Sequence, residues 1–174
     1  MHKLRFATML CVAPALYAAP WSIPLLGAQP QPGQTGCLAI YETHASMTAE
    51  DAQEKGVPAG YRIVASADGV LKVLVREAAA IDGADVAKAE QGVTQETASP
   101  IVGIAFKAEG TRKLAALTSR NVGRALAIVV DRRLISAPIV REPILEGKVN
   151  IAGNFTAGDA AKLASSIRSA TCAG

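Results

Sequence analysis

The chain of 174 residues is poor in the residues that most catalytic and metal sites require. Only 4% of its residues are aromatic, and it contains two histidines and three cysteines, none of them in a Cys-x-x-Cys pair. His44, the only histidine beyond the N-terminal segment, is expected to be an exposed loop residue and cannot anchor a zinc site of ordinary spacing. Ser136 lacks a Gly-x-Ser-x-Gly elbow and a nearby base. We therefore predict no enzyme activity, no bound metal and no cofactor.

Strong charge is also lacking. The formal net charge is +3, and Lys3 and Arg5 account for two of these charges, which leaves +1 for the rest. A field this weak, with no basic stripe interleaved with aromatics, excludes nucleic acid as the main partner. The glycines are too scattered for a phosphate-binding loop, so no small-molecule substrate is predicted either.

The N-terminal residues have the layout of a secretory signal peptide. Two cations precede the apolar run Ala7–Leu16, and a cleavage site is plausible after Ala28. The alternative is an uncleaved N-terminal membrane anchor, against which three prolines argue: Pro14, Pro20 and Pro24. Either interpretation places the domain outside the cytoplasm, in the periplasm or secreted. We assign 1–28 to the signal peptide, 29–36 to a Pro/Gly-rich spacer and 37–174 to a single domain.

Half of the residues are apolar, and the scarcity of aromatics predicts an aliphatic core. Hydrophobic periodicity and turn residues predict the elements of the first two thirds of the domain. These are strands at Leu38–Thr43, Tyr61–Ala65, Val70–Val75 and Ile101–Phe106, a short helix after Thr48, a small helix at Gly83–Ala89 and a longer helix at Ala108–Ser119. Asp82 is suited to cap the small helix, and Gln91–Ser99 is predicted to be a polar loop.

The stretch from Thr118 to Thr156 organises the rest of the chain. It predicts a helix exit at Asn121-Val122-Gly123, a strand Ala125–Val130, a turn, a second strand Leu134–Val140 and a short strand within Val149–Ala152. Thr156 and Asp159 then form a capping box for a helix with an apolar stripe. The stripe consists of Ala160, Leu163, Ala164 and Ile167.

This order of residues resembles the first periplasmic domain, the head region, of SecD, a membrane subunit of the protein-export machinery. The family's pattern is N-V-G-x-x-L-A-I-V-x-D, then I-S-A-P-x-I-x-E-P-I, then I-x-G-N-F-T, and the likeness extends from Val75 to Arg168. The residues that carry the motif are Asn121, Gly123, Asp131, Pro138, Gly153, Asn154, Phe155 and Thr156. The expected fold is α+β, with a mixed, mostly antiparallel sheet and two main helices packed on one face.

Two departures from the family pattern matter. The aspartate of the family's hairpin is usually followed by glycine, whereas Arg132 follows Asp131 here. A two-residue primed turn would strain Arg132, so we expect a longer or differently wound turn. The sequence also ends where the family's chain continues into a second membrane helix. We therefore interpret the protein as a stand-alone secreted relative without the transmembrane pump.

The resemblance implies an exported, non-enzymatic binding module that contacts polypeptides or export machinery in the cell envelope. The alternative is a structural or regulatory envelope domain that binds one specific folded partner. The candidate contact loop is Arg141, Glu142, Pro143, Ile144 and Leu145, where the proline breaks the strand. Its two apolar side chains form either a partner-contact site or a segment tucked under the sheet. The membrane would be contacted only through an uncleaved N-terminal segment.

Removal of the signal peptide would leave two cysteines, Cys37 and Cys172. An even pair in an oxidising compartment is most simply interpreted as a disulfide, here joining the two ends of the domain. Unpaired thiols on the two ends, or links between molecules, are the alternatives.

Overall fold

The computed structural model describes residues 38–169. The predicted signal peptide, the spacer, Cys37 and Cys172 lie outside the described residues, so the predictions about them remain predictions.

The described residues form nine strands, three α-helices and one 3-10 turn, η1. In chain order these are β1 (Leu38–Glu42), α1 (Ala49–Lys55), β2 (Tyr61–Ala65), β3 (Lys72–Arg76), β4 (Ile81–Asp82), η1 (Gly83–Asp85), β5 (Val86–Val93), β6 (Pro100–Phe106), α2 (Ala108–Arg120), β7 (Leu126–Val130), β8 (Arg133–Ser136), β9 (Lys148–Ala152) and α3 (Ala157–Arg168). The predicted order of elements is confirmed, except that β4 was not predicted and that residues 83–93 differ from the prediction.

A four-stranded sheet in the order β4-β1-β7-β8 lies at the centre of the domain, and all of its pairings are antiparallel. All five residues of β7 are buried. Since successive side chains point to opposite sides of the sheet, both faces of the sheet are covered at this strand. Leu38 and Ile40 of β1 enter one core cluster, whereas Ala39 and Tyr41 enter another. β7 pairs with β8, which confirms the predicted pairing of the two strands on either side of the turn at Asp131.

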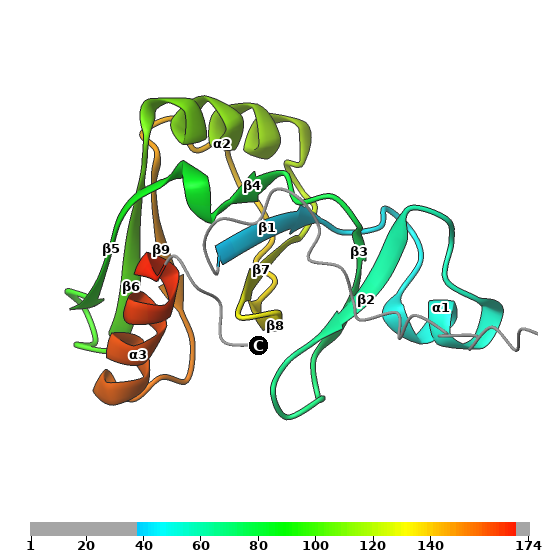
Figure 1. Cartoon of the computed structure of the whole chain (residues 1–174), viewed down its shortest axis with the longest axis horizontal. Coiled ribbons are helices and arrows are strands. Elements are labelled where there is room, and N and C mark those ends of the chain that lie inside the picture. The colour runs from blue at the N-terminus through cyan, green and yellow to red at the C-terminus, as the bar shows by residue number, and fades with distance from the viewer. Residues whose placement is uncertain (1–37, 170–174) are drawn as a thin grey trace, which may run out of the picture. The chain divides into compact units, whose positions relative to one another are not determined.

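The larger core lies between the central sheet and a second sheet, β5-β6-β9, which is also antiparallel. α2 contributes Leu114 and Leu117 to this core, and α3 contributes Ala160, Ala164 and Ile167. Both main helices therefore pack on the same side of the central sheet, and Figure 1 shows α2 above the strands and α3 beside β5 and β6. The predicted α+β class is confirmed. The strands, expected in one sheet, divide among three, because α2 carries the chain from β6 in one sheet to β7 in another.

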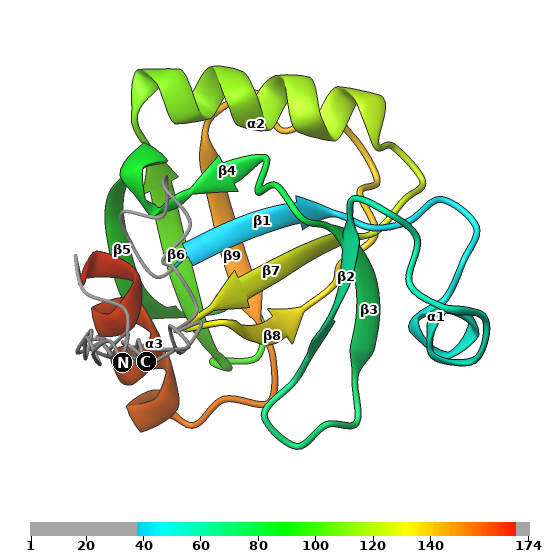
Figure 2. The ribbon, with the colours of Figure 1, turned by 45° about the vertical axis from the view of Figure 1, so that its right-hand side comes forward.

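The hairpin β2–β3 forms the third sheet and covers the other face of the central sheet. Val64 and Val75 pack there against Tyr41, and the Arg62 guanidinium lies 4.8 Å from the centre of the Tyr41 ring. Figure 2 shows the hairpin crossing the ends of β1 and β7, with α1 beyond it. The short helix predicted after Thr48 is present as α1, and Thr48 and Asp51 cap it reciprocally.

The helix predicted at Gly83–Ala89 is wrong. Asp82 does cap a turn, but that turn is a single 3-10 turn, and the chain is extended from Val86. The local signal for a helix start is genuine, yet β6 offers a complete antiparallel partner to the residues that follow. Strand β5 also runs through Val93 and so shortens the loop predicted at Gln91–Ser99.

The prediction of a longer or differently wound turn after β7 is also wrong. Val130 pairs with Arg133, so Asp131 and Arg132 alone form the turn. Both have positive φ, 49° and 63°, as a two-residue type I′ hairpin turn requires. The β7–β8 pairing therefore holds Arg132 in a backbone conformation that glycine adopts far more readily. Strand β8 ends at Ser136, before the predicted end at Val140, and an isolated bridge between Ala125 and Ile139 lies beyond it.

Candidate binding cleft

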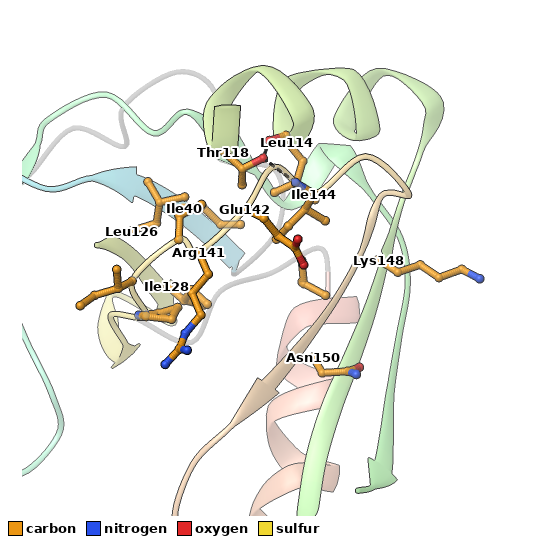
Figure 3. Close-up of a pocket in the computed structure, with 14 residues that line it drawn as sticks. Ile40, Leu114, Thr118, Leu126, Ile128, Arg141, Glu142, Ile144, Lys148 and Asn150 are labelled. Carbon is orange, nitrogen blue, oxygen red and sulfur yellow. Dashed lines mark hydrogen bonds between the residues drawn. The ribbon is translucent and has the colours of Figure 1, made fainter. Parts of the chain in front are cut away.

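An apolar cleft of about 380 Å³ opens between the central sheet and β9. Ile40, Leu126 and Ile128 line it from the central sheet, and Leu114 and Thr118 line it from α2. The remaining walls come from 138–142, from Ile144 and from 148–150 (Figure 3). The volume lies within the usual range for ligand sites in proteins, and the lining is mainly aliphatic.

The predicted contact loop forms one side of this cleft, but its two apolar residues have different roles. Ile144 is half-buried, packs against the main core and donates its backbone N–H to the Thr118 hydroxyl at 2.9 Å. Leu145 is 68% exposed and Ile139, just before the loop, is 65% exposed. The loop thus tucks Ile144 under α2 and leaves Leu145 exposed to solvent, and the partner contact stays a prediction.

Charged side chains surround the cleft. Arg141, Glu142 and Lys148 line it and are exposed. Among the described residues, none of the three forms an ion pair within the domain. Figure 3 shows Glu142 near the middle of the lining residues and Lys148 pointing away from them. Charges that remain unpaired within the domain are available to a bound partner.

Asn121 of the family motif anchors the C-terminus of α2 rather than the cleft. Its side chain is fully buried and donates to the Leu117 carbonyl and to Glu42 Oε1, both at 2.8 Å. Arg120 Nε also reaches Glu42 Oε1 at 2.7 Å, and Arg76 Nε lies 3.2 Å from Oε2. Burial raises the pKa of Glu42, but the hydrogen bonds from Asn121 and Arg120 and the two arginine charges lower it below its ordinary value.

The other motif residues shape turns. Gly123 has φ of 79°, and its N–H donates to the Val140 carbonyl. The Pro138 carbonyl accepts from the Leu126 N–H, which extends the β7–β8 association past the end of β8 and forms the wall of the cleft. These hydrogen bonds hold the main chain near residues 138–140 in place, so Gly123 and Pro138 of the motif have a structural role.

The motif residues before α3 lie outside this cleft. The Phe155 ring lies directly over Gly153, where a Cβ would come within 2.9 Å of the ring, and packs against the main core. Asn154 is exposed in the turn, and Thr156 caps α3 with Asp159 as predicted. Sequence reasoning missed the residues that complete the cleft from distant parts of the chain, namely Ile40, Lys148 and Asn150.

No group of three or more potential metal ligands occurs among residues 38–169. His44 is half-buried rather than exposed, which corrects the expectation for this residue. Its Nδ1 accepts from the backbone N–H groups of Ser46 and Met47, and its ring packs edge-on against Tyr61 at 4.7 Å. The histidine therefore organises the loop before α1. Ser136 lies in β8, as expected of a strand residue.

The family model of the SecDF P1 head subdomain matches residues 61–172, which include the whole contact loop and β9. The chain belongs to this family. The resemblance predicted from the 121–156 stretch is thereby confirmed. Within the part of the chain that the structure describes, no helix of this P1 head domain is long and apolar enough to cross a membrane.

The P1 head domain is similar to curated proteins named protein translocase subunit SecD. It is 32% identical over 139 residues to SecD of Rickettsia prowazekii (strain Madrid E) and 35% identical over 136 residues to SecD of Aquifex aeolicus (strain VF5). Each match covers 78% of this chain and 27% of the relative. The chain thus spans about a quarter of the length of the curated relatives it matches.

Solved structures share the fold. A structure described as a membrane component SecDF that enhances protein export matches with a TM-score of 0.58 and 24% identity, over 78% of this chain and 63% of that chain. SecDF in a super-membrane-facing form matches with a TM-score of 0.59 and 24% identity, over 78% of this chain and 19% of that chain. At this identity the likeness concerns the fold alone.

Proposed function

We propose that this P1 head domain is an exported, non-catalytic binding module that contacts polypeptides or export machinery in the cell envelope, with the cleft as its contact site. The observation that carries the proposal is the aliphatic cleft with Ile139 and Leu145 exposed beside it. Apolar side chains exposed at the rim of an apolar cleft mark surfaces that another molecule covers. The signal-peptide pattern of residues 1–28 supports an exported location, periplasmic or secreted.

The composition of the site suits a polypeptide better than a small polar substrate. Ile40, Leu126 and Ile128 offer an aliphatic surface to apolar side chains, while Arg141, Glu142 and Lys148 offer both signs of charge near its mouth. Mixed charges at the rim suit partners of varied sequence, since neither sign is excluded. A contact of this kind also fits the export machinery after which the similar SecD proteins are named.

Site-specific photo-crosslinking in cells tests the proposal. A photoreactive residue at Ile139 or at Leu145 is expected to capture a range of exported polypeptides or components of the export machinery. The matched control is Val70, which is 83% exposed in the β2–β3 turn and does not line the cleft.

Three outcomes are informative. Crosslinks to many exported chains from Ile139 and Leu145, but not from Val70, support contact with polypeptides. One defined folded product instead supports the alternative of a specific envelope partner. Equal labelling from all three positions would exclude the cleft as the contact site.

A further inference from the structure

β9 is an edge strand whose free side carries a regular row of backbone groups. Among residues 38–169 it pairs with β6 alone, and the Phe106 N–H donates to the Gly147 carbonyl at the start of this ladder. Hydrogen-bonded and non-bonded pairs alternate along an antiparallel ladder. Val149 and Ile151 therefore bond to β6, and the N–H and C=O groups of the alternate residues point away from it. These residues are Lys148, Asn150 and Ala152, and all three are exposed.

The cleft runs along this free edge. Three consecutive residues of β9 line it, from Lys148 to Asn150. Successive side chains of a strand point to opposite faces, so a cleft that touches three residues in a row lies beside the strand rather than over one face. Residues 138–142 form the opposite wall of the cleft and contain no helix. The Val140 N–H donates there to the Arg124 carbonyl, as in a pairing of extended chains.

The other edge of the same sheet is partly blocked at Ala89. Main-chain groups alternate in direction along β5 as they do along β9, so the Ala89 carbonyl points away from β6. Arg168 Nη1 donates a hydrogen bond to this carbonyl at 2.6 Å. A register shift between Val86 and Lys88 further disturbs β5 as a template. Proteins usually block exposed edges in such ways, because an open edge pairs with other chains. Among the described residues, no hydrogen bond of this kind covers the outward groups of β9.

We propose that the free edge of β9 binds an extended polypeptide as an added strand, with the main chain of the ligand paired to Lys148, Asn150 and Ala152 and its alternate side chains in the apolar cleft. The complementarity is electrostatic: N–H and C=O dipoles alternate along the edge, and another extended main chain presents the matching pattern. Main-chain pairing is largely independent of side-chain sequence. This inference rests on the proposed function and specifies how the same cleft recognises unfolded segments.

The test uses the full exported chain and a dye-labelled synthetic peptide of about eight residues that alternates valine and threonine, which favour extended structure. Binding is measured by fluorescence anisotropy for the unmodified protein, Asn150→Pro and Asn150→Ala. Proline at 150 removes only an outward N–H and breaks no bond to β6, which is the kind of edge-strand position where proline occurs in sheets. Asn150→Pro should weaken binding by about tenfold or more, since the ring removes a donor and obstructs the incoming strand. Asn150→Ala keeps the N–H, so it should weaken binding far less than Asn150→Pro does, and Val70→Ala, in the β2–β3 turn away from the cleft, should bind like the unmodified protein.

A second peptide, with the same side chains but methylated backbone nitrogens, should fail to bind the unmodified protein. Equal binding of the two peptides, or unchanged binding by folded Asn150→Pro, would overturn the proposal. If Asn150→Pro does not fold, amide hydrogen exchange of the unmodified protein decides. The peptide should then protect the amides of Lys148, Asn150 and Ala152, and no added protection there refutes the pairing. Crosslinking from Leu145 does not depend on Asn150. If crosslinking succeeds and the pairing test fails, the proposed function stands and only the added-strand proposal is refuted.

Discussion

The strained turn between β7 and β8 gives a sharp test of the architecture, through the substitution Arg132→Gly. Arg132 has φ of 63°, in the left-handed region, where an ordinary L-residue is less stable by about 1–2 kcal/mol. Glycine removes this strain but adds flexibility to the unfolded chain, which offsets about 0.4–1 kcal/mol of the gain. Asp-Gly is also a favoured pair for the type I′ turn. We expect Arg132→Gly to raise the free energy of unfolding by about 0.5–1 kcal/mol, against the usual effect of glycine.

The assay is urea and thermal unfolding of the full exported chain, and the expected rise in Tm is about 2–5 °C. Two controls separate backbone strain from charge. Arg132→Ala removes the charge but keeps the strain and should change stability little. Arg133→Gly, one residue later and within β8, should destabilise by about 0.5–1 kcal/mol, because glycine weakens a strand. If Arg132→Gly destabilises as much as Arg133→Gly, the left-handed turn and the reasoning from it are refuted.

Three further predictions concern other parts of the domain. Glu42→Gln should lower stability at neutral pH by about 1–2 kcal/mol, since the carboxylate is 16% exposed and accepts hydrogen bonds from charged donors. Because the folded pKa of Glu42 lies below the ordinary value of 4.5, its contribution is present above that pH and is lost as the pH falls through the folded pKa, so the two unfolding curves should converge in acid. Gly110→Ala should destabilise by about 1–2 kcal/mol despite the better helix propensity of alanine, because its Cβ would lie 2.7 Å from the Asp85 carbonyl oxygen; equal or higher Tm would contradict this close approach. Mass spectrometry of the unreduced exported protein should show a Cys37–Cys172 disulfide, which reduction should destabilise by about 4–5 kcal/mol in the chain-entropy model; two free thiols on a monomer would disprove it.

The sequence by itself determined the features that depend on a few neighbouring residues. The helix start at Thr48, the capping box at Thr156 and the apolar stripe of α3 form as predicted, and Gly123 has a positive φ at the predicted helix exit. The β7–β8 pairing belongs to the same class, because the two strands adjoin in sequence. Such features involve only local hydrogen bonds and side-chain spacing, so the sequence signal for them is complete. The family motif follows these local features, which explains why the resemblance was visible from sequence.

The tertiary structure alone decided the rest. Residues 86–93 follow a good helix start, yet β6 makes them a strand, because long-range pairing outweighs local preference. The turn at Asp131–Arg132 keeps its strained conformation because β1 and β8 fix β7 on both sides. The cleft depends on distance in space rather than in sequence: Ile40 and Lys148 line the same cleft only because the two sheets pack on one core. No local pattern contains that information, since each residue lies in an ordinary strand and becomes part of a site only when the sheets pack.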